Sequence, residues 1–472
     1  MKHIQQIYID GKFVHPHGTE TLNLINPTNQ KVIGRVTLAD EEDAKLAISA
    51  AKKAFTWYSN TSLKERGEYL TRLHDSVKAR EKDLLDVMVE EYGGPVQFSQ
   101  AAVQRTISSF LQAKATMEKF EFVRSIGQAQ IHMKPLGVVG LITPWNANNS
   151  FIASKLSMSL ASGSTAVLKP SEMSALQTQV MTEALHAADL PPGLFNIVTG
   201  RGDIVGAEIT RNPDIAKISF TGSTVVGKTI ARGAVDTLKR VTLELGGKSP
   251  NIILDDADFE KAIPLAINIA FMNSGQACIA GSRLLIPESR LEEAKKLIVK
   301  AIESVRTGTP RSPETQIGPM VSVKQYERVQ SYIQSGIDEG AELLIGGLHQ
   351  PEGLENGNFV KPTAFVARPD MRIAREEIFG PVLSVMTYKS EEEAIRLAND
   401  TVYGLHGYVS SGSAERGALV ASQIVAGRVF VNGMYDEPLA PFGGFKQSGL
   451  GREFGSFGLE AYLEPKTFIG PR

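Results

Sequence analysis

The sequence has one cysteine, Cys278, which lies in the stretch FMNSGQACIAGSR. No charged residue occurs between positions 262 and 282, so the thiol belongs to an uncharged run. A thiolate is a strong nucleophile, and it forms more readily beside a base or a positive dipole. A lone cysteine is also common as a small buried side chain. The role of this thiol therefore depends on which groups the fold brings to the sulfur.

The first half of the chain contains five β-rich segments, and a polar or glycine-rich stretch follows each of them. The segments cover residues 137–142, 164–169, 194–198, 216–220 and 241–245, with helical patterns near 151–161, 174–189, 204–211 and 224–235. This alternation predicts a parallel sheet covered by helices. Ligands of such sheets lie beyond the carboxyl ends of the strands, where helix N-termini present free N–H groups. We therefore expect a binding site at that edge.

Two glycine-containing loops at this edge fit a nucleotide phosphate. In FTGSTVVGK, Gly222 allows a tight turn, Ser223 is placed to cap the next helix, and Gly227 lets that helix pack closely. TGRGDIVG contains Gly202 and Gly206 but is one residue longer than the dinucleotide fingerprint, so it is a weaker indication. A plain capped turn is the alternative interpretation of the first loop.

Lys169 and Glu172 follow the second segment and are candidates for holding a ribose. A carboxylate accepts hydrogen bonds from ribose hydroxyls and repels a 2'-phosphate, which favours NAD over NADP. An exposed ion pair in front of a helix is the alternative interpretation. Ser174 and Gln177 are spaced as a capping box, which predicts that the next helix starts there.

Composition excludes several classes of function. The net charge of -2 offers no field for nucleic acid or anionic lipid, and a single cysteine excludes an intramolecular disulfide. Uncharged runs at 135–154 and 262–282 contain too many Asn, Pro and Ser residues for a membrane span. The eight histidines are scattered, so we predict no metal site. The start of the sequence has no apolar signal core, and we expect a cytoplasmic protein.

The second half repeats the α/β pattern and predicts a second domain. Its β-rich segments are 283–287, 341–346, 359–366, 381–388, 405–411 and 428–433, with helices at 391–400 and 414–427. Residues 42–120 are mostly helical by pattern. Residues 121–135 and the tail after 458 fall outside both sheets, and we expect them to pair as a small extra sheet.

Seven motifs resemble the NAD(P)-dependent aldehyde dehydrogenases, and they occur in the order of that family. They are ITPWN (142–146), LKPSE (168–172), FTGS (220–223), LELGGKSP (243–250), GQAC (275–278), EEIFGP (376–381) and PFGGFKQSGLGRE (441–453). The resemblance implies an α/β, aldehyde dehydrogenase-like fold with two parallel-sheet domains. Residues 1–115 and 136–247 would form the Rossmann-like NAD-binding domain, 248–447 the catalytic domain, and 116–135 with 458–472 a small β oligomerisation arm. A homo-oligomer, dimer or tetramer, is expected.

The resemblance also implies residue roles. Cys278 would be the nucleophile, Glu244 the general base and Asn146 an oxyanion donor, and Glu453 resembles the second acidic residue of the family. The residues expected at the cofactor are Thr143, Trp145, Lys169, Ser171, Glu172, Gly202, Gly206, Phe220, Ser223, Leu245, Glu377 and Phe379. Those expected around the substrate are Ala147, Ala277, Ile279, Tyr435 and Phe442. The small Ala147 leaves room for a moderately bulky apolar aldehyde.

These roles predict oxidation of an aldehyde to a carboxylate through a thiohemiacetal and a thioester on Cys278, with NAD as the hydride acceptor. Within the family, transfer of the thioester to coenzyme A is an alternative, but Glu244 favours hydrolysis. A cysteine hydrolase would need a histidine against Cys278, and none lies within 70 residues of it in sequence. A non-catalytic NAD-binding relative is the remaining alternative.

Overall fold

The β-rich segments of the first half form the middle of an eight-stranded sheet in the computed structural model, which describes residues 2–470. The strand order is β20 (Gly449–Leu450), β12 (Arg240–Glu244), β11 (Ile215–Thr221), β8 (Val138–Ile142), β9 (Thr165–Lys169), β10 (Phe195–Ile197), β2 (Ile7–Ile9) and β3 (Lys12–Val14). The strands from β12 to β10 are parallel, and β20 and β2 pair antiparallel at the two ends of this group. Every residue of β8 and β9 is buried, which explains their continuous apolar sequence.

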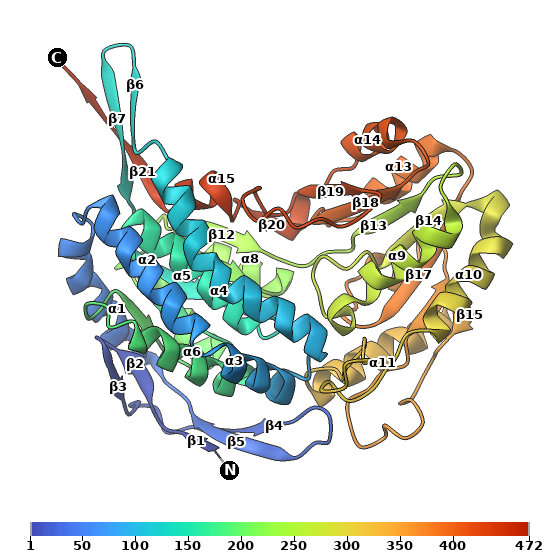
Figure 1. Ribbon diagram of the computed structural model, residues 1–472, viewed down its shortest axis with the longest axis horizontal. Helices are drawn as coiled ribbons and strands as arrows, with labels where there is room; N and C mark the ends of the chain where they lie inside the picture. Colours follow the sequence, from blue (N-terminus) through green and yellow to red (C-terminus); the bar gives the residue numbers. More distant parts are fainter. Residues whose placement is uncertain (1, 471–472) are drawn as a thin grey trace.

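Helices cover both faces of this sheet (Figure 1). One layer contains α2 (Leu63–Lys78), α3 (Glu81–Val87), α4 (Val96–Lys119), α5 (Asn148–Ser162) and α6 (Ala175–Ala187), and these helices pack on one another. The other contains α1 (Glu41–Tyr58), α7 (Ala207–Arg211) and α8 (Thr224–Val235). Separate apolar clusters occupy the two faces of the sheet. The carboxyl ends of β8, β9, β11 and β12 therefore lie at one edge between the layers.

The predicted start of α6 is confirmed, but its predicted capping box is wrong. The Ser174 side chain makes no cap hydrogen bond. Instead the carboxylate of Glu91, in the π-helical turn Met88–Tyr92, accepts the backbone N–H groups of Leu176 at 2.8 Å and Gln177 at 2.9 Å. Glu91 is 85 positions before Leu176 in the chain, so local spacing gives no sign of this cap.

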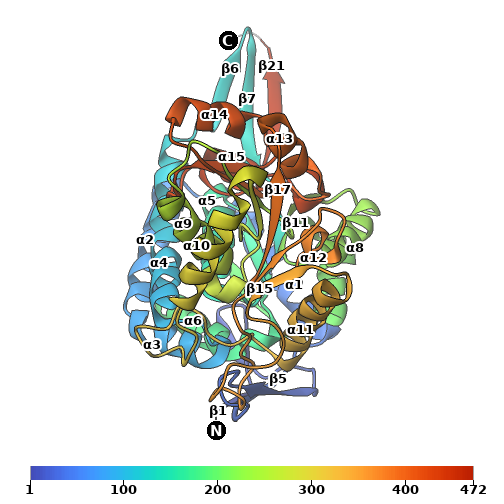
Figure 2. The ribbon, with the colours of Figure 1, turned by 90° about the vertical axis from the view of Figure 1, so that its right-hand side faces the viewer.

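The second lobe, which faces the viewer in Figure 2, is built on a seven-stranded sheet with one antiparallel edge. Its order is β15 (Glu342–Ile345), β16 (Thr363–Val366), β17 (Val382–Tyr388), β14 (Arg283–Pro287), β13 (Pro250–Ile253), β18 (His406–Ser410) and β19 (Arg428–Val431). Only β15 runs antiparallel to its neighbour. Its helices are α9 (Phe259–Phe271), α10 (Leu291–Glu303), α11 (Val323–Asp338), α12 (Arg372–Arg375), α13 (Glu391–Asn399) and α14 (Ala414–Ser422). The sequence patterns missed the central strand β13.

Two small sheets complete the fold, which also has a short helix α15 (Gly455–Glu460). One joins β1 (Lys2–Ile4), β5 (Val32–Thr37) and β4 (Thr21–Ile25). The other, hereafter the arm, joins β6 (Val123–Ile126), β7 (Ala129–Pro135) and β21 (Leu463–Ile469), and it projects from the body (Figures 1 and 2).

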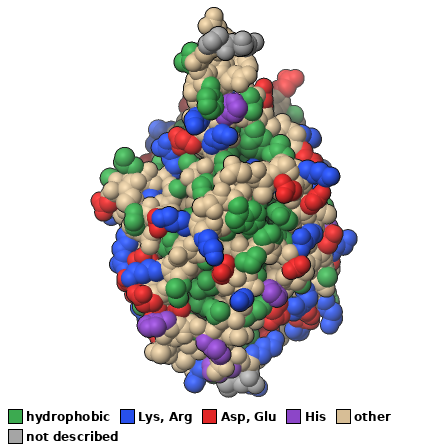
Figure 3. All heavy atoms as spheres, turned by 90° about the vertical axis from the view of Figure 1, so that its left-hand side faces the viewer, with side chains coloured by type: hydrophobic (Ala, Val, Ile, Leu, Met, Phe, Trp, Pro, Cys, Tyr) green, Lys and Arg blue, Asp and Glu red, His purple; other side chains and the backbone are tan. Residues whose placement is uncertain are grey.

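The surface carries both signs of charge, and Figure 3 shows them interspersed with apolar side chains on one face. No helix within residues 2–470 is both long enough and apolar enough to cross a membrane. In the same part of the chain, no three His, Cys, Asp or Glu side chains are grouped so that they could hold a metal ion.

Candidate active site

The loop that carries Cys278 is held in a strained conformation between the two lobes. After α9 the chain turns through the segment Met272–Gly275, in which Asn273 has φ 52° and Ser274 has φ 58°. Such left-handed values are uncommon for residues other than glycine and persist where neighbours enforce them. Here Tyr92 donates its hydroxyl proton to Asn273 Oδ1 at 2.8 Å, and Ser274 Oγ accepts the N–H of Gly318 at 2.9 Å. The half-buried Cys278 is thereby fixed in place.

Asn146 follows β8 and is tied directly to this loop. Its side-chain amide donates to the carbonyl of Gln276 at 3.0 Å, and Asn273 Nδ2 donates to the carbonyl of Asn146 at 3.1 Å. An asparagine amide has two N–H groups, so one remains for an acceptor beside Cys278. The structure therefore joins Asn146 and the cysteine loop, which are 132 positions apart in the sequence.

Glu244 ends β12 as a buried carboxyl group with 3% exposure. Neither of its carboxyl oxygens has a hydrogen-bond partner within residues 2–470. Burial raises the pKa of Glu244 well above its ordinary value, and the charge of Glu453 adds to this rise. An unpaired buried carboxyl group can take and release protons without first breaking a hydrogen bond, which suits a general base.

The thiol of Cys278 interacts electrostatically with the carboxyl group of Glu244. Burial raises the pKa of the Cys278 thiol to about 12, with further increases from Glu377 and Glu244, while the backbone N–H groups of Cys278 and Ile279 act in the opposite direction. The resting thiol is therefore neutral at physiological pH. A base must remove its proton before it can attack a substrate.

Two glycines let the chain pass between these groups. A Cβ atom on Gly247 would lie 2.3 Å from the carbonyl oxygen of Cys278, and one on Gly246 would lie 2.4 Å from Glu377 Oε2. Gly247 also donates its N–H to Glu377 Oε1 at 3.0 Å. Burial raises the pKa of Glu377 to about 7. The absence of side chains at Gly246 and Gly247 thus allows both Glu377 and Cys278 to pack against this short backbone segment.

Phe379 lies beside Trp145 at the same junction. Their ring centroids are 5.4 Å apart in an edge-to-face arrangement with an interplanar angle of 88°, and Phe379 has a left-handed φ of 62°. Trp145 directly precedes Asn146, so the two aromatic rings adjoin the residue expected to donate to an oxyanion.

Glu453 lies in a buried ion pair rather than in the open site. Its Oε1 accepts hydrogen bonds from Lys155 Nζ and, at 2.9 Å, from Ser219 Oγ, and Lys155 Nζ also donates to Ser219 Oγ at 2.9 Å. Lys155 was not among the residues expected from the sequence. It is the one charged residue in the segment of α5, 148–162, and that isolation was the available signal.

The residues expected at the cofactor lie along the carboxyl edge of the eight-stranded sheet. Lys169, the last residue of β9, donates to Glu172 Oε2 at 2.8 Å, and Ser223 caps α8 by accepting the N–H of Val226 at 3.3 Å. A Cβ atom on Gly227 would lie 2.4 Å from Leu245 Cδ2, so α8 packs as closely as its glycine allows. The remaining members are Thr143 after β8, Phe220 in β11, Ser171 ahead of a short 3-10 turn, and Gly202 and Gly206 at the ends of a π-helical turn.

The residues expected around the substrate come from different parts of the fold and differ in exposure. Ala277 and Ile279 flank Cys278, Ala147 directly precedes α5, and the backbone of Phe442 pairs with that of Glu453. Tyr435 is 65% exposed, and its hydroxyl donates to the carbonyl of Asn432 in its own loop at 3.2 Å.

Two side chains near the cysteine were not expected from the sequence. Tyr408 donates its hydroxyl proton to the carbonyl of Ile279 at 2.8 Å, and His406 Nδ1 lies 3.3 Å from the same hydroxyl. Burial lowers the pKa of His406 to about 3, so the imidazole is neutral. Its recorded contact is with Tyr408 rather than with the thiol, which does not match the nucleophile–histidine pair of a cysteine hydrolase.

Comparison with known proteins identifies the family. The model of the aldehyde dehydrogenase family matches residues 13–468. The chain belongs to the aldehyde dehydrogenase family. As an aldehyde dehydrogenase it is an oxidoreductase, and its α/β fold is that of the family.

Individual relatives share nearly the whole aldehyde dehydrogenase fold. The chain is 44% identical to a 3-succinoylsemialdehyde-pyridine dehydrogenase of Pseudomonas sp over 100% of this chain and 99% of the relative. It is 40% identical, with a TM-score of 0.97, to Aldehyde Dehydrogenase C of Pseudomonas syringae, solved as a mutant with NAD+ and octanal; the match covers 98% of this chain and 96% of the other. A betaine aldehyde dehydrogenase of Staphylococcus aureus, solved with NAD+, is 34% identical with a TM-score of 0.95, covering 99% and 95%.

Proposed function

We propose that this protein oxidises an aldehyde to the corresponding carboxylate with NAD+, through a thiohemiacetal and then a thioester on Cys278. One observation carries the proposal: Glu244 is a buried carboxyl group without a hydrogen-bond partner among the described residues, and its charge reaches the lone thiol. A base beside a neutral thiol is the arrangement that nucleophilic catalysis at neutral pH requires.

In the first step, the ionised Glu244 takes the thiol proton, and the sulfur of Cys278 attacks the carbonyl carbon. The carbonyl π electrons move to oxygen, where the second N–H of Asn146 and the backbone N–H of Cys278 are suited to stabilise the charge. NAD+, held beside the adduct by Glu377 and Phe379, would supply the hydride acceptor that this oxidation to the thioester requires.

Glu244 first releases the thiol proton to solvent. In the second step, Glu244 takes a proton from water, and the resulting hydroxide attacks the thioester carbon. The C–S bond breaks, the carboxylate leaves, and the sulfur of Cys278 is reprotonated. Each turnover thus consumes the aldehyde, one water and NAD+, and it yields the carboxylate, NADH and two protons. Because only ionised Glu244 accepts a proton, its raised pKa makes hydrolysis faster as the pH rises.

The residues at the carboxyl edge fit a dinucleotide. Position 202 has no neighbouring atom within 4 Å of a Cβ placed there, and Gly227 allows the tight packing that sets the N-terminus of α8 at this edge. Lys169, Glu172 and Ser223 would hold the adenosine and phosphate portions, Glu377 the nicotinamide ribose, and Phe379 would lie against the nicotinamide. The carboxylate of Glu172 favours NAD over NADP because it repels a 2'-phosphate.

The substrate, by this proposal, is an aldehyde of moderate bulk. Support comes from the small side chain of Ala147 and from the relatives, one named for a semialdehyde with a pyridine ring and another solved with octanal. We also propose that residues 1–115 and 136–247 act as the NAD-binding domain and residues 248–447 as the catalytic domain. The arm, whose Ile469 is 80% exposed, would join subunits of a homo-oligomer in the cytoplasm.

The test is NADH formation from a panel of aldehydes, measured with and without coenzyme A. We expect NADH without coenzyme A, little activity with NADP+, and the carboxylate as product by mass spectrometry. Strict dependence on coenzyme A would replace hydrolysis with acyl transfer. NAD+ binding without turnover of any aldehyde would instead identify a non-catalytic relative.

A further inference from the structure

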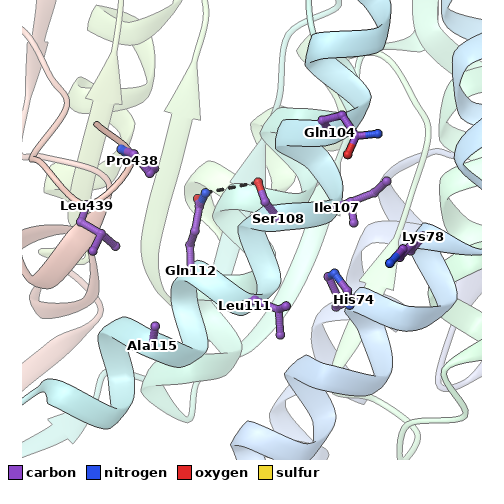
Figure 4. Close-up of a pocket in the computed structure, with 10 residues that line it drawn as sticks. All are labelled: His74, Lys78, Gln104, Ile107, Ser108, Leu111, Gln112, Ala115, Pro438 and Leu439. Carbon is purple, nitrogen blue, oxygen red and sulfur yellow. Dashed lines mark hydrogen bonds between the residues drawn. The ribbon is translucent and has the colours of Figure 1, made fainter. Parts of the chain in front are cut away.

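One loop and one helix close the outer side of the region around Cys278. The loop consists of residues 433–440, between β19 and Pro441, and is called here the rim loop. At its start, Met434 Sδ lies 4.0 Å from the hydroxyl of Tyr408, which binds the carbonyl of Ile279 next to the cysteine. At its far end, Pro438 and Leu439 lie across from α4 (Figure 4). The rim loop therefore runs from the flank of the thiol to α4.

The facing part of α4 is also anchored beside the expected site. Ser150, in the first turn of α5 just after Ala147, donates its hydroxyl proton to the carbonyl of Ala102 at 2.8 Å, and its Oγ lies 3.0 Å from Thr106 Oγ1. Phe98, one turn earlier in α4, packs in the same apolar cluster as Trp145. Residues 98–106 of α4 thus form a wall next to Asn146 and Ala147.

Arg105 lies on this wall and faces the rim loop. Its guanidinium carbon is 5.9 Å from the centroid of the Phe98 ring, and Asp436 of the rim loop is the acidic group that interacts with it electrostatically. Within residues 2–470 the guanidinium has no hydrogen bond and no ion pair. Its donors are therefore available to a ligand.

The guanidinium of a second arginine near Asp436, Arg428, already makes hydrogen bonds within the protein. Arg428 also interacts electrostatically with Asp436, but its guanidinium donates to the carbonyls of Pro441 at 2.9 Å and Glu437 at 3.3 Å, and to that of Ala440. These bonds hold the rim loop in place. Of the two guanidinium groups around Asp436, only that of Arg105 is free.

We propose that Arg105 binds an oxygen acceptor, a carboxylate or a ketone carbonyl, that the substrate carries at a distance from its aldehyde group. This inference rests on the proposed function and specifies its substrate class. A guanidinium presents a planar fork of N–H donors that matches such oxygens, and the exposed side chain can reorient toward a ligand. Ser150, three residues after Ala147, binds the carbonyl of Ala102, which is three residues before Arg105.

The surface beyond Arg105 has room for the rest of such a molecule. A hollow of about 440 Å3 begins at Gln104, continues along α4 past Ile107 and Leu111, and is bounded by Leu439 of the rim loop. Figure 4 shows these side chains on facing elements rather than packed together. Arg105 does not itself line this hollow, but its neighbour Gln104 does, and by this proposal an apolar end group attached to the bound oxygen would lie there.

The test compares three aldehydes of equal chain length: hexanal, 4-oxohexanal and 6-oxohexanoate. In Arg105→Gln we expect KM to rise about 10- to 100-fold for the aldehydes with an acceptor, the range for losing a hydrogen bond to a charged group, and kcat to change little. Hexanal should change by less than about threefold. Arg105→Lys keeps the charge but loses the fork, so it should recover only part of the loss.

The matched control is Lys114→Gln, which removes one positive charge from the same helix at a residue paired with Glu118. It should leave all three aldehydes unchanged. A carboxylate ligand predicts that added salt weakens binding and that Asp436→Asn strengthens it, whereas a ketone ligand predicts little salt dependence.

Two results would overturn the inference, and they are distinguishable. Equal changes for all three aldehydes in Arg105→Gln, or no change, would refute the role of Arg105 while leaving aldehyde oxidation intact. Failure of the unaltered protein to oxidise any of the three would refute the proposed function, and the inference with it.

Discussion

Glu244 and Glu453 are two buried carboxyl groups a short distance apart, yet their surroundings are opposite. Glu244 ends β12, where it pairs in register with Gly449, and neither of its oxygens has a hydrogen-bond partner within residues 2–470. Glu453 follows β20 and accepts hydrogen bonds from Lys155 and Ser219. The same fold thus leaves one carboxyl group without a hydrogen bond and gives the other two hydrogen bonds, both to Oε1.

The difference distinguishes Glu244, the group proposed to move protons, from Glu453, a group whose charge affects the pKa of Glu244. An unpaired buried carboxyl group costs stability, and such costs concentrate at functional sites. In a paired one, the opposite charge of the lysine offsets part of the cost of burial. Glu453 raises the pKa of Glu244 and Lys155 lowers it. The ion pair therefore contributes two opposing effects to the pKa of the proposed base.

Removing the thiol should have the largest effect on turnover, because both carboxyl groups are proposed to serve a reaction at Cys278. Cys278→Ala should lower turnover by at least about 10^4-fold, as loss of a nucleophile does elsewhere. NAD+ binding, measured by calorimetry, should be retained. Undiminished NADH formation by this variant would exclude the sulfur from the reaction.

Replacing the unpaired carboxyl group is the next largest change. Glu244→Gln should slow steady-state turnover by about 10^2- to 10^4-fold, the range for a general base. Rapid-mixing absorbance should still show a burst of NADH if the thioester forms and then persists. An unchanged steady-state rate would remove Glu244 from water activation.

Asn146→Ala tests whether the site depends on the amide that touches the cysteine loop. Loss of one oxyanion donor costs about 10^2- to 10^3-fold in kcat. Asn146→Asp provides a control of nearly the same shape that places a repelling charge at the adduct oxygen. If the aspartate variant were the faster of the two, the oxyanion role would be wrong.

The smallest expected effect on rate belongs to the paired carboxyl group. Glu453→Gln should reduce turnover by less than about tenfold, because the group does not contact the reacting atoms. Removing its negative charge lowers the pKa of Glu244, so the rising limb of the pH–rate profile should move to lower pH by about one unit or less.

The same variant leaves Lys155 buried without its partner, which should cost about 3 to 5 kcal/mol of folding stability. Thermal unfolding should show a lowered midpoint. Lys217→Met is a comparison at an equally buried lysine, which donates to Thr242 and interacts with Glu453 electrostatically without forming an ion pair with it. An unmoved pH profile in Glu453→Gln would contradict the proposed tuning of Glu244.

Most parallel strands of both sheets were predictable because their burial on both faces produces short, continuous apolar runs. β13 was missed because its segment is short, begins at a proline and follows two glycines. The short strands of the N-terminal region were missed for a similar reason, since three residues carry too little pattern. Contacts across the chain, such as the cap that Glu91 places on α6, have no local signal at all.

For the candidate site, motifs indicated the groups that are proposed to react, but they did not predict which side chains surround those groups. The bond from Asn146 to the loop of Cys278 follows from the topology. The partner of Glu453 and the free guanidinium of Arg105 depend on side chains that meet only after packing. Lys155 might have been suspected from its isolation in an uncharged helix, whereas Arg105 resembles many surface arginines in sequence.

The pairing of β20 with β12 has a consequence for the order in which the protein is made. The first lobe exposes an unpaired strand edge on β12 until residues 449–450 arrive, after the whole second sheet has been synthesised. A nascent chain on the ribosome therefore carries its thiol long before Glu453 reaches Lys155. Chaperones that shield open strand edges have a long interval in which to act on this chain.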